Sequence, residues 1–403
     1  MTPYVAPGWA GAASVRTAVL RAALLPLGLL APVIAGAQPA ASPMNPSPID
    51  WGLVLDGAHA SEDLELAHRE RGFGFGHAEF TAAGRIDDLF SGRLTAALHH
   101  HDGETEVELE EAFIDAPGLP GGLQVRAGRF LSQVGYLNER HAHADDFTER
   151  PLLYRAFFGT HWSDTGLRLN WVAPTALYWR VGVEAFDGGR LASESADNGR
   201  SVGVTTFSTR LGGDIGRSHS WQLGLSWLRN RITPAAGDDG LHGEDEDHGH
   251  EHEEDHDHAH GAGYTGGRMF IADAVWKWAP DGNNAARQLR LSGEYARVDD
   301  LSEFASRDDI HEAWYLAAVY RFAPRWELGA RTGSLEVSEP HGDHFHRGRL
   351  RETSLMLAWV RSHFATLRLQ WTTQRDRGGF EHAGNAISLQ YVMSLGAHGA
   401  HAF

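Results

Sequence analysis

The feature that most constrains the fold of this chain is an alternation of apolar and polar residues with a period of two. Residues 365–372 read ATLRLQWT, which puts Leu367 and Trp371 on one face and Arg368 and Gln370 on the other. Successive side chains of a β-strand point to opposite sides of the sheet, whereas a helix repeats every 3.6 residues. Because the pattern recurs along most of the chain, it predicts an all-β protein.

Sixteen segments carry the alternation, each near the ten residues typical of a membrane-spanning strand. They are residues 50–58, 73–86, 90–101, 105–115, 123–134, 164–172, 176–187, 201–214, 219–232, 268–279, 287–298, 312–322, 325–336, 350–361, 364–375 and 385–396. Short connections, such as 173–175, alternate with long ones, such as 188–200 and 337–349. We therefore predict a transmembrane antiparallel β-barrel of about 16 strands (14–18), with short periplasmic turns and long external loops.

The polar faces of the predicted strands favour a barrel over a soluble sandwich. Arginine and glutamate recur on these faces, which suits a water-filled lumen, while the apolar faces would meet lipid. Tryptophan and tyrosine occur near the strand ends, as an interfacial girdle requires. The chain ends in Phe403, which has the parity of the apolar face of the last strand and resembles the assembly signal of outer-membrane proteins.

The N-terminal residues 1–37 have the features of a secretory signal peptide. Arg16 and Arg21 form a basic region, and an apolar run follows over residues 22–34. Ala35-Gly36-Ala37 is a small-residue cleavage signature. The apolar run is shorter than the roughly 20 residues of a membrane-spanning helix. We expect cleavage before Gln38 and export of the remaining chain.

The mature chain is expected to be an acidic protein of the bacterial outer membrane. Residues 38–49 would form a short periplasmic segment and residues 50–403 the barrel, with lipid as its first partner. Removal of two signal-peptide arginines changes 35 basic and 53 acidic residues, a net charge of −18, to 33 minus 53, or −20. This balance argues against nucleic-acid binding. The chain has no cysteine, so a closed hydrogen-bonded barrel would supply the stability that disulfides give other exported proteins.

Histidine is the most unusual component of the composition, with 25 residues. The candidate metal ligands fall into four clusters: His242, His248, His250, His252, His256, His258 and His260 within the acidic stretch 242–260; His99, His100 and His101; His141 and His143; and His341, His344 and His346. In the predicted topology all four clusters fall on the same, outward side. The connection 233–267 has nothing apolar to bury over most of its length and is expected to be disordered.

Neutral imidazole nitrogens suit zinc and other divalent transition metals. An unperturbed histidine has a pKa of roughly 6.5, so most histidines are neutral at pH 7. Neighbouring aspartates and glutamates add oxygen ligands and concentrate cations. The pattern therefore predicts labile capture of a divalent metal, most readily zinc, rather than a fixed cofactor. A loop that merely stays solvated is the alternative, and for His99–His101 and His341–His346 it has comparable weight.

The third outward connection, residues 135–163, occupies the position where sixteen-stranded porins fold a loop into the lumen. We hypothesise that Asp145, Asp146 and Glu149 face arginines of the barrel wall across a constriction. The wall and lumen arginines chosen from the polar faces are Arg126, Arg168, Arg180, Arg331 and Arg368. An ordinary external loop is the equally weighted alternative.

Three segments, GRFLSQVGYLN at 128–138, WKWAPDGN at 276–283 and MSLGAHGAH at 393–401, resemble a family of proteobacterial outer-membrane proteins. That family is porin-like and is often described as zinc-regulated or labelled TonB-dependent. The resemblance covers most of the mature chain and carries no catalytic motif. Residues 38–49 are too few to form the plug that fills a TonB-dependent barrel.

Together these patterns predict an outer-membrane channel that admits small solutes, with histidine-rich external loops that capture divalent metal for uptake. Two alternatives stay open: a surface barrel that binds or buffers metal without transport, and an arginine-lined anion-selective porin without a metal role. We expect no enzymatic activity, because no G-x-S-x-G motif is present. A porin-like homotrimer and a monomer are both compatible with the sequence.

Overall fold

The computed structural model describes residues 49–75, 77–101, 104–191, 202–231, 263–302, 304–341, 344–380 and 382–396, which belong to one compact unit. Its only α-helix among these residues is α1 (Leu152–Phe158), and four short 3-10 helices are η1 (Pro120–Gly122), η2 (Ala142–Ala144), η3 (Gly189–Leu191) and η4 (Pro280–Gly282). No helix in the described part of the chain is long and apolar enough to cross a membrane.

Nearly all of the remaining regular structure is antiparallel β-sheet. The strands are β1 (Ile49–Ala60), β2 (Gly72–Phe75), β3 (Ala78–Arg85), β4 (Ser91–His101), β5 (Glu104–Leu119), β6 (Leu123–Leu131), β7 (Ser163–Val172), β8 (Tyr178–Phe186), β9 (Val204–Ile215), β10 (His219–Asn230), β11 (Arg268–Trp278), β12 (Gln288–Asp299), β13 (His311–Ala323), β14 (Trp326–His341), β15 (His344–Ser362), β16 (Ala365–Asp376) and β17 (Asn385–Gly396).

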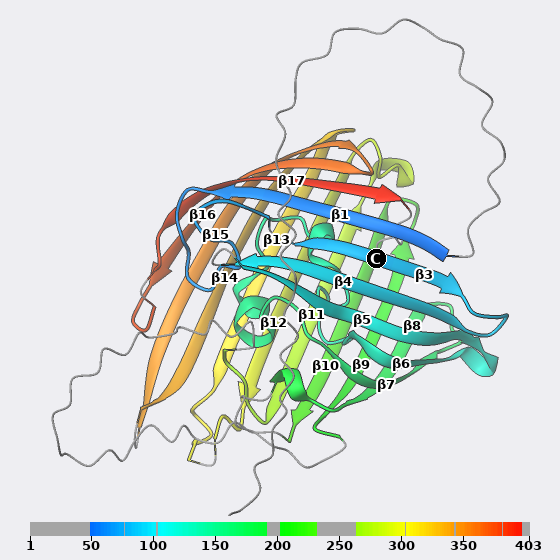
Figure 1. Ribbon diagram of the computed structural model, residues 1–403, viewed down its shortest axis with the longest axis horizontal. Helices are drawn as coiled ribbons and strands as arrows, with labels where there is room; N and C mark the ends of the chain where they lie inside the picture. Colours follow the sequence, from blue (N-terminus) through cyan, green and yellow to red (C-terminus); the bar gives the residue numbers. More distant parts are fainter. Residues whose placement is uncertain are drawn as a thin grey trace, which may run out of the picture. The chain divides into compact units, whose positions relative to one another are not determined.

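The sheet closes on itself, because β1 pairs with β17 on one side and with both β2 and β3 on the other (Figure 1). Since β2 and β3 are consecutive pieces of one strand, the 17 strands form a barrel of 16, which confirms the predicted fold class. Each strand pairs with its sequence neighbour, so no crossover connection is needed. Closure leaves no unpaired sheet edge, as a membrane-spanning β-structure requires.

Each of the sixteen predicted strands is present, with two differences of detail. The segment 73–86 is divided into β2, which ends at Phe75, and β3, which begins at Ala78. The expected long loop 337–349 is wrong, because β14 continues to His341 and β15 begins at His344. His341, His344 and His346 therefore lie on strands rather than in an external loop.

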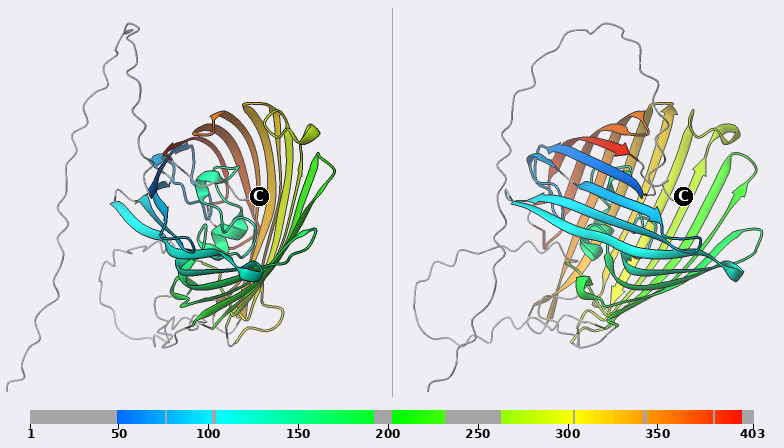
Figure 2. Two further views of the ribbon diagram at one scale, coloured as in Figure 1. Left: turned by 90° about the vertical axis from the view of Figure 1, so that its right-hand side faces the viewer. Right: turned by 45° about the vertical axis from the view of Figure 1, so that its right-hand side comes forward.

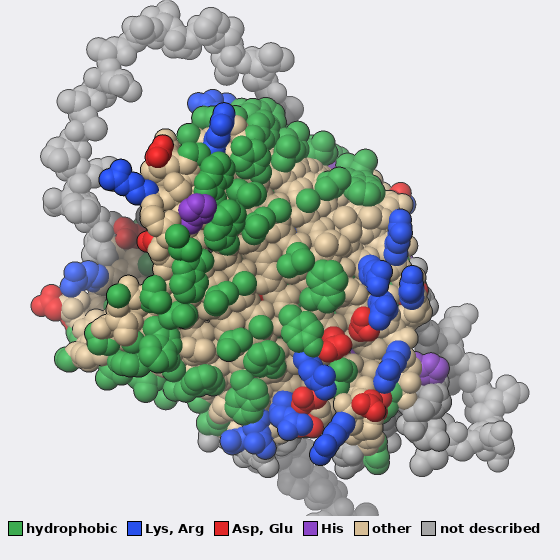
Figure 3. Space-filling model, turned by 180° about the vertical axis from the view of Figure 1, so that it is seen from behind, with side chains coloured by type: hydrophobic (Ala, Val, Ile, Leu, Met, Phe, Trp, Pro, Cys, Tyr) green, Lys and Arg blue, Asp and Glu red, His purple; other side chains and the backbone are tan. Residues whose placement is uncertain are grey.

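The strand β10 illustrates how the alternating sequence builds the two faces of the barrel wall. Leu223 and Leu225 are about half exposed on the outside, whereas Gln222 and Ser226 are buried inside. Figure 3 shows the same arrangement over a whole face, with hydrophobic side chains across it and charged groups along parts of its edge. Exposed tryptophans lie near both ends of the strands: Trp51, Trp171, Trp179 and Trp326 near the short-turn ends, and Trp227 and Trp314 near the opposite ends.

This outer surface has the chemistry of lipid contact, because large apolar side chains are exposed all round the wall. They include Leu167, Leu169, Val183, Phe207, Leu223, Leu225, Phe270, Leu291, Leu316, Leu328, Leu355, Leu369, Ile387, Leu389 and Leu395. A sixteen-strand barrel with an apolar exterior and aromatic residues near its rims belongs in the bacterial outer membrane, as predicted.

The barrel is not empty. The connection between β6 and β7, residues 132–162, turns back into the ring of strands and is called the inner loop below (Figure 2). It carries η2 and α1, and all seven residues of α1 are buried. The helix packs against the inner faces of β13 and β14. The inner loop and the wall around it form the candidate functional site.

Candidate functional site in the barrel interior

The inner loop is closed at its neck by a single asparagine. The Asn138 side-chain amide donates to the carbonyl oxygens of Ser132 and Trp162, each at 2.9 Å, and its oxygen accepts the Trp162 N–H at 2.8 Å. The Ser132 N–H also donates to the Trp162 carbonyl at 3.1 Å. Both ends of the loop are therefore held together where the chain leaves β6 and enters β7.

Beyond the neck, the loop is bonded to the opposite wall through Glu294 of β12. The hydroxyls of Tyr154 and Tyr315 donate to this carboxylate at 2.8 and 2.7 Å, and the Tyr136 N–H donates at 2.8 Å. Gly135 makes this approach possible: its φ is +65°, and a Cβ there would lie 2.4 Å from the Tyr154 hydroxyl and 2.5 Å from the Glu294 carboxylate. Burial and Glu294 hold the pKa of Tyr154 well above its usual value, so this tyrosine remains a hydrogen-bond donor.

The helix α1 is fixed to the wall by buried charge pairs. Arg155 forms an ion pair with Glu352 of β15, and Arg331 of β14 donates to the same carboxylate at 3.0 Å. Arg331 also donates to the Glu149 carbonyl at 2.7 Å. Because removal of one partner from such a network leaves a buried charge uncompensated, the seating of α1 depends on all three charged groups.

The three acidic residues predicted at a constriction occupy different positions around the inner loop. Asp146 forms an ion pair with Arg290 of β12, and Glu149 lies 3.5 Å from Arg69. Asp145 pairs at 2.8 Å with Arg150 of the same loop rather than with the wall.

Two of these carboxyls have pKa values moved in opposite directions. Burial raises the pKa of Asp146, but Arg290 and Arg140 outweigh it and hold the value below the usual range. Burial raises the pKa of Glu149 above its usual value, in spite of Arg69 and Arg155. The Asp146 carboxylate is therefore the one that keeps its negative charge most firmly.

The five arginines chosen from the sequence all lie on the inside of the wall, and each has an internal partner. Arg126 pairs with Asp115 at 2.8 Å, Arg168 with Glu184 at 2.6 Å and with Glu139 at 3.0 Å, and Arg180 with Glu139 at 3.0 Å; Arg331 contacts Glu352, and Arg368 donates to Gln390 and to the Asp145 carbonyl. Most of the arginine charge is therefore neutralised locally.

A cavity of about 400 Å³ remains open beside the inner loop. Its lining is polar and charged and includes Tyr136, Glu139, Arg180, Arg210, Tyr178 and Trp221. Tyr178 begins β8 and Trp221 lies near the start of β10, so the cavity lies toward the short-turn end of the barrel.

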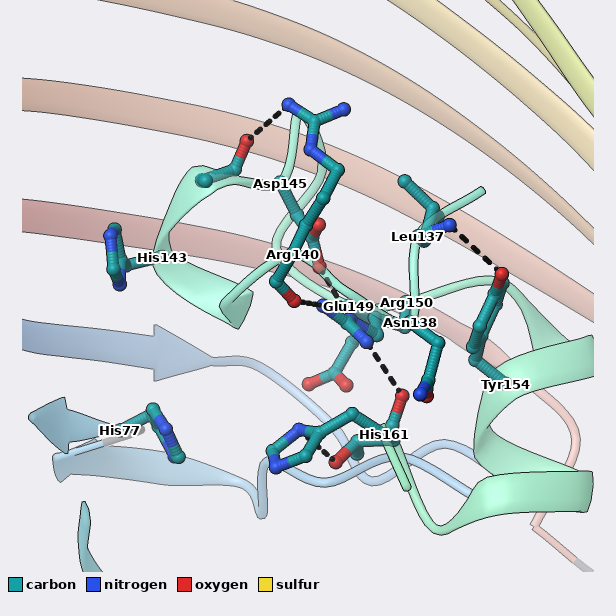
Figure 4. Close-up of polar contacts among 12 residues, drawn as sticks. His77, Leu137, Asn138, Arg140, His143, Asp145, Glu149, Arg150, Tyr154 and His161 are labelled. Carbon is teal, nitrogen blue, oxygen red and sulfur yellow. Dashed lines mark hydrogen bonds and ion pairs between the residues drawn. The ribbon is translucent and has the colours of Figure 1, made fainter. Parts of the chain in front are cut away.

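On the β3–β5 side of the inner loop lies a second kind of contact, called the histidine–glutamate cluster below. It consists of His77, Glu79, Glu110, Glu111, His141, His143 and His161. His141 Nδ1 lies 3.1 Å from both Glu79 and Glu110, and its Nε2 lies 3.2 Å from Glu111. Figure 4 shows His143 and His161 on the inner loop, facing the wall segment that carries His77.

The four histidines are the polar partners of three buried glutamates. Ligand atoms of Glu79 and Glu110 lie within 4.8 Å of each other, where two negative charges repel by about 3 kcal/mol at an effective dielectric constant near 20. Burial lowers the pKa of His141, but Glu79 and Glu110 outweigh it and raise the value well above the ordinary one. Burial instead lowers the pKa of His161.

A β-bulge brings two consecutive glutamates of β5 into this cluster. Thr95 pairs with Glu111 and Ala96 with Leu109, so Glu110 is an extra residue with no partner opposite it. Bulges redirect side chains in this way. The Glu110-Glu111 dipeptide interrupts the apolar–polar alternation, and an irregular strand could have been inferred from that interruption.

The structure describes three of the four predicted histidine clusters, and it places them differently. His141 and His143 lie inside the barrel, so their expected position on an external rim is wrong. His99, His100 and His101 are at the end of β4, where the backbone pairs with residues 104–106 of β5. His341, His344 and His346 lie on β14 and β15, while His242, His248, His250, His252, His256, His258 and His260 are outside the described residues, as is the predicted signal peptide.

Sequence reasoning did not select His77, His161, Glu79, Glu110 or Glu111 as site residues. Histidines so far apart in the chain give no spacing pattern, and glutamate on a lumen face is ordinary. Only the folding of the inner loop into the barrel brings them together.

Comparison with known proteins gives one distant sequence relative. No family model matches the chain. An uncharacterized protein of Aquifex aeolicus is 26% identical over 368 residues, which are 86% of this chain and 73% of that protein.

Solved structures with the same fold are outer-membrane proteins. OprB of Pseudomonas putida has a TM-score of 0.56 at 14% identity and covers 86% of this chain and 94% of its own. A loop-deletion mutant of OmpT from Vibrio cholerae has 0.53 at 10%, covering 86% and 99%. An anion-selective porin from Comamonas acidovorans has 0.51 at 10%, covering 87% and 99%. At these identities the likeness concerns the porin-type barrel alone.

Proposed function

We propose that this protein is a passive outer-membrane channel for small hydrophilic solutes. The observation that supports it most is the inner loop, which is bonded to the wall of a sixteen-strand barrel and leaves a polar cavity beside it. Barrels of this size have a lumen wide enough for water, and a loop inside one limits what passes. OprB, OmpT and DcaP structures share this barrel type, and DcaP of Acinetobacter baumannii is described as an outer membrane channel.

The experiment is single-channel recording of the refolded protein in planar bilayers, together with liposome swelling in sugars of increasing size. We expect discrete conductance steps and a swelling rate that falls steeply with solute mass. Silent bilayers from protein that shows the heat-modifiable migration of a folded barrel would contradict the channel.

The finer part of the proposal is that the histidine-rich stretch 242–260 captures divalent metal, zinc first, for entry through the channel. Its support is the density of imidazole and carboxylate groups in that stretch. Replacing the seven histidines by asparagine should impair growth under zinc limitation and leave growth in zinc-replete medium unchanged. Equal growth of both strains, with zinc still bound at the surface, would favour the non-transporting metal binder instead.

The anion-selective alternative has less support, because the lumen arginines are paired with carboxylates.

Two further expectations belong to the same proposal. One form of Vibrio cholerae OmpT is described as a trimer, and we expect the same assembly here, which crosslinking in native membranes would test. Zinc-dependent expression, implied by the sequence resemblance, would be tested by transcript levels after zinc depletion.

A further inference from the structure

We propose that the histidine–glutamate cluster inside the barrel binds one divalent transition-metal ion that ties the inner loop to the wall. This site shares no residue with the histidine stretch 242–260, and it does not depend on whether the barrel conducts. Its residues come from three places in the fold: the β2–β3 junction, the bulge of β5, and the inner loop.

The central ligand set is His77, Glu79 and Glu110. Each offers one ligand atom, and these atoms all lie within 4.8 Å of one another. His77 Nε2 lies 3.1 Å from Glu79 Oε1 and 3.6 Å from Glu110 Oε1. Ligand atoms about 2.1 Å from a tetrahedral zinc ion are roughly 3.4 Å apart, so these separations match the edges of such a site.

The inner loop supplies nitrogen atoms for the remaining position. His143 Nδ1 lies 3.0 Å from Glu79 Oε1, and His161 Nε2 lies 2.7 Å from Glu110 Oε1. Neither histidine belongs to the group of mutually close ligand atoms, so a side-chain shift of His143 or His161 would be needed to complete a set of two nitrogens and two oxygens. His141 has both ring nitrogens directed at carboxylates and holds Glu79, Glu110 and Glu111 in place, the role that residues beyond the ligands have at metal sites.

The choice of counter-charge distinguishes this cluster from the rest of the lumen. Carboxylates such as Asp115, Glu184 and Glu352 face arginine, which cannot give up its proton. Within the described part of the chain, every ion-pair partner of Glu79, Glu110 and Glu111 is a histidine. Histidine can lose a proton and present a lone pair, so this buried set of carboxylates is suited to exchange protons for a metal ion.

Two buried carboxylate oxygens provide an independent observation. Glu110 Oε1 and Glu111 Oε2 are buried, and they lie 2.7 Å from His161 Nε2 and 3.2 Å from His141 Nε2 without the geometry of a hydrogen bond. Buried carboxylate oxygens are normally hydrogen-bonded. The same two residues stand at the bulge, where the irregular backbone turns an additional carboxylate inward.

The chemistry of the donors selects the ion. Imidazole and carboxylate together suit zinc and its first-row neighbours, whereas magnesium prefers oxygen ligands and water. We therefore use Zn²⁺ as the probe and Mg²⁺ as the competitor.

The test is metal content of the full mature chain, folded in detergent, loaded with Zn²⁺ and then washed with excess Mg²⁺ and a weak chelator that strips exposed, labile histidines. Wild type should retain one zinc per chain, and zinc-edge absorption should show nitrogen and oxygen ligands near 2.0–2.1 Å with no sulfur. Glu110→Gln and His77→Ala should each reduce retained zinc at least tenfold. Glu108→Gln is the matched control, because Glu108 lies on the same strand but pairs with Arg129 and Arg190.

Retention of zinc in the control and its loss in both cluster variants would support the site. Wild type that retains no zinc would overturn the proposal, as would Glu110→Gln that retains as much as wild type. If Glu110→Gln does not fold, as judged by heat-modifiable migration, the zinc retained by Glu79→Gln and His77→Ala decides the question instead, and both should lose it. If the wild-type protein retains one zinc per chain but shows no conductance in bilayers, the result would count against the proposed channel and not against this metal site.

Discussion

Two kinds of cation contact the carboxylates of the barrel interior, and each suits a different task. Arginine keeps its charge at all working pH values, so pairs such as Arg290 with Asp146 fix a permanent charge pattern. Histidine can be charged or neutral, so the three glutamates of the histidine–glutamate cluster face an adjustable environment. The first arrangement suits a constriction and the second suits exchange of protons or metal.

Exposure separates the two neighbouring aspartates of the inner loop. The side chain of Asp146 is 24% exposed and that of Asp145 only 8%. Asp146→Asn should leave Arg290 uncompensated in the lumen and raise the anion-to-cation permeability ratio by roughly two- to fivefold. The size follows from the interaction energy of two unit charges in water, which is ~1 kcal/mol at a separation of 4 Å. Asp145→Asn should change the ratio less. Reversal potentials in salt gradients measure both, and equal shifts in the two variants would contradict this assignment.

The lowered pKa of Asp146 also sets a pH window. A carboxyl whose pKa is lower in the folded state stabilises the fold above its unfolded pKa of roughly 3.9, and this contribution is lost as the pH falls through the folded value. The difference in selectivity between wild type and Asp146→Asn should therefore be constant from pH 7 to pH 5. A difference that disappears with a midpoint between pH 5 and pH 7 would contradict the depressed pKa.

At the scale of elements, the inner loop is a separate unit held in a barrel that closes without it. The neck at Asn138 joins the ends of β6 and β7, whereas Tyr154 and Arg155 attach the far part of the loop to β12 and β15. Wall strands bond to each other through the backbone, so contacts of the loop can be weakened without opening the sheet.

Arg155→Ala tests this division. Glu352 would keep Arg331 and Gln374 but lose one buried charged partner, which should weaken the seating of α1 by about 1–3 kcal/mol. We expect a larger single-channel conductance and faster trypsin cleavage at Arg140 and Arg150, with the barrel itself folded. Arg85→Ala, at the exposed end of β3, is the control, and an unchanged conductance in Arg155→Ala would show that α1 does not limit the pore.

At the scale of the whole molecule, the barrel is a protein with its polar core inside and its apolar surface outside. The outward side chains, Leu223 among them, meet lipid instead of a second sheet, and the buried positions of the same strands are glutamine, serine and arginine. The cost of placing a charged side chain on the outer face therefore depends on the depth of that position in the bilayer.

Leu223→Arg places a charge near the middle of β10 on the lipid side. Such a substitution should reduce the free energy of unfolding by about 2–4 kcal/mol in lipid vesicles, because the guanidinium would lie in the hydrocarbon region. Leu223→Phe, which stays apolar, should change it by less than about 1.5 kcal/mol. Guanidinium titration followed by tryptophan fluorescence measures both, and equal stabilities would mean that this face does not contact lipid.

The sequence by itself determined the strands, their number and the face of each residue. Alternation with a period of two is a local property, because neighbouring side chains of a strand must point to opposite sides, and β10 and β16 have that pattern written in full. The same rule failed at residues 337–349, where loop-like polar residues continue β14 and β15, and at Glu110, where the bulge breaks the period.

Only the tertiary structure decided what the barrel contains. His143 contacts Glu79 across 64 positions of the chain, and Tyr154 reaches Glu294 across 140. No local rule relates residues so distant, since their contact depends on the inner loop turning inward at Gly135 and on the wall closing between β1 and β17. The histidines that the composition made conspicuous as a group were therefore separated by folding, and His141 and His143 joined two histidines and three glutamates that no sequence pattern had grouped.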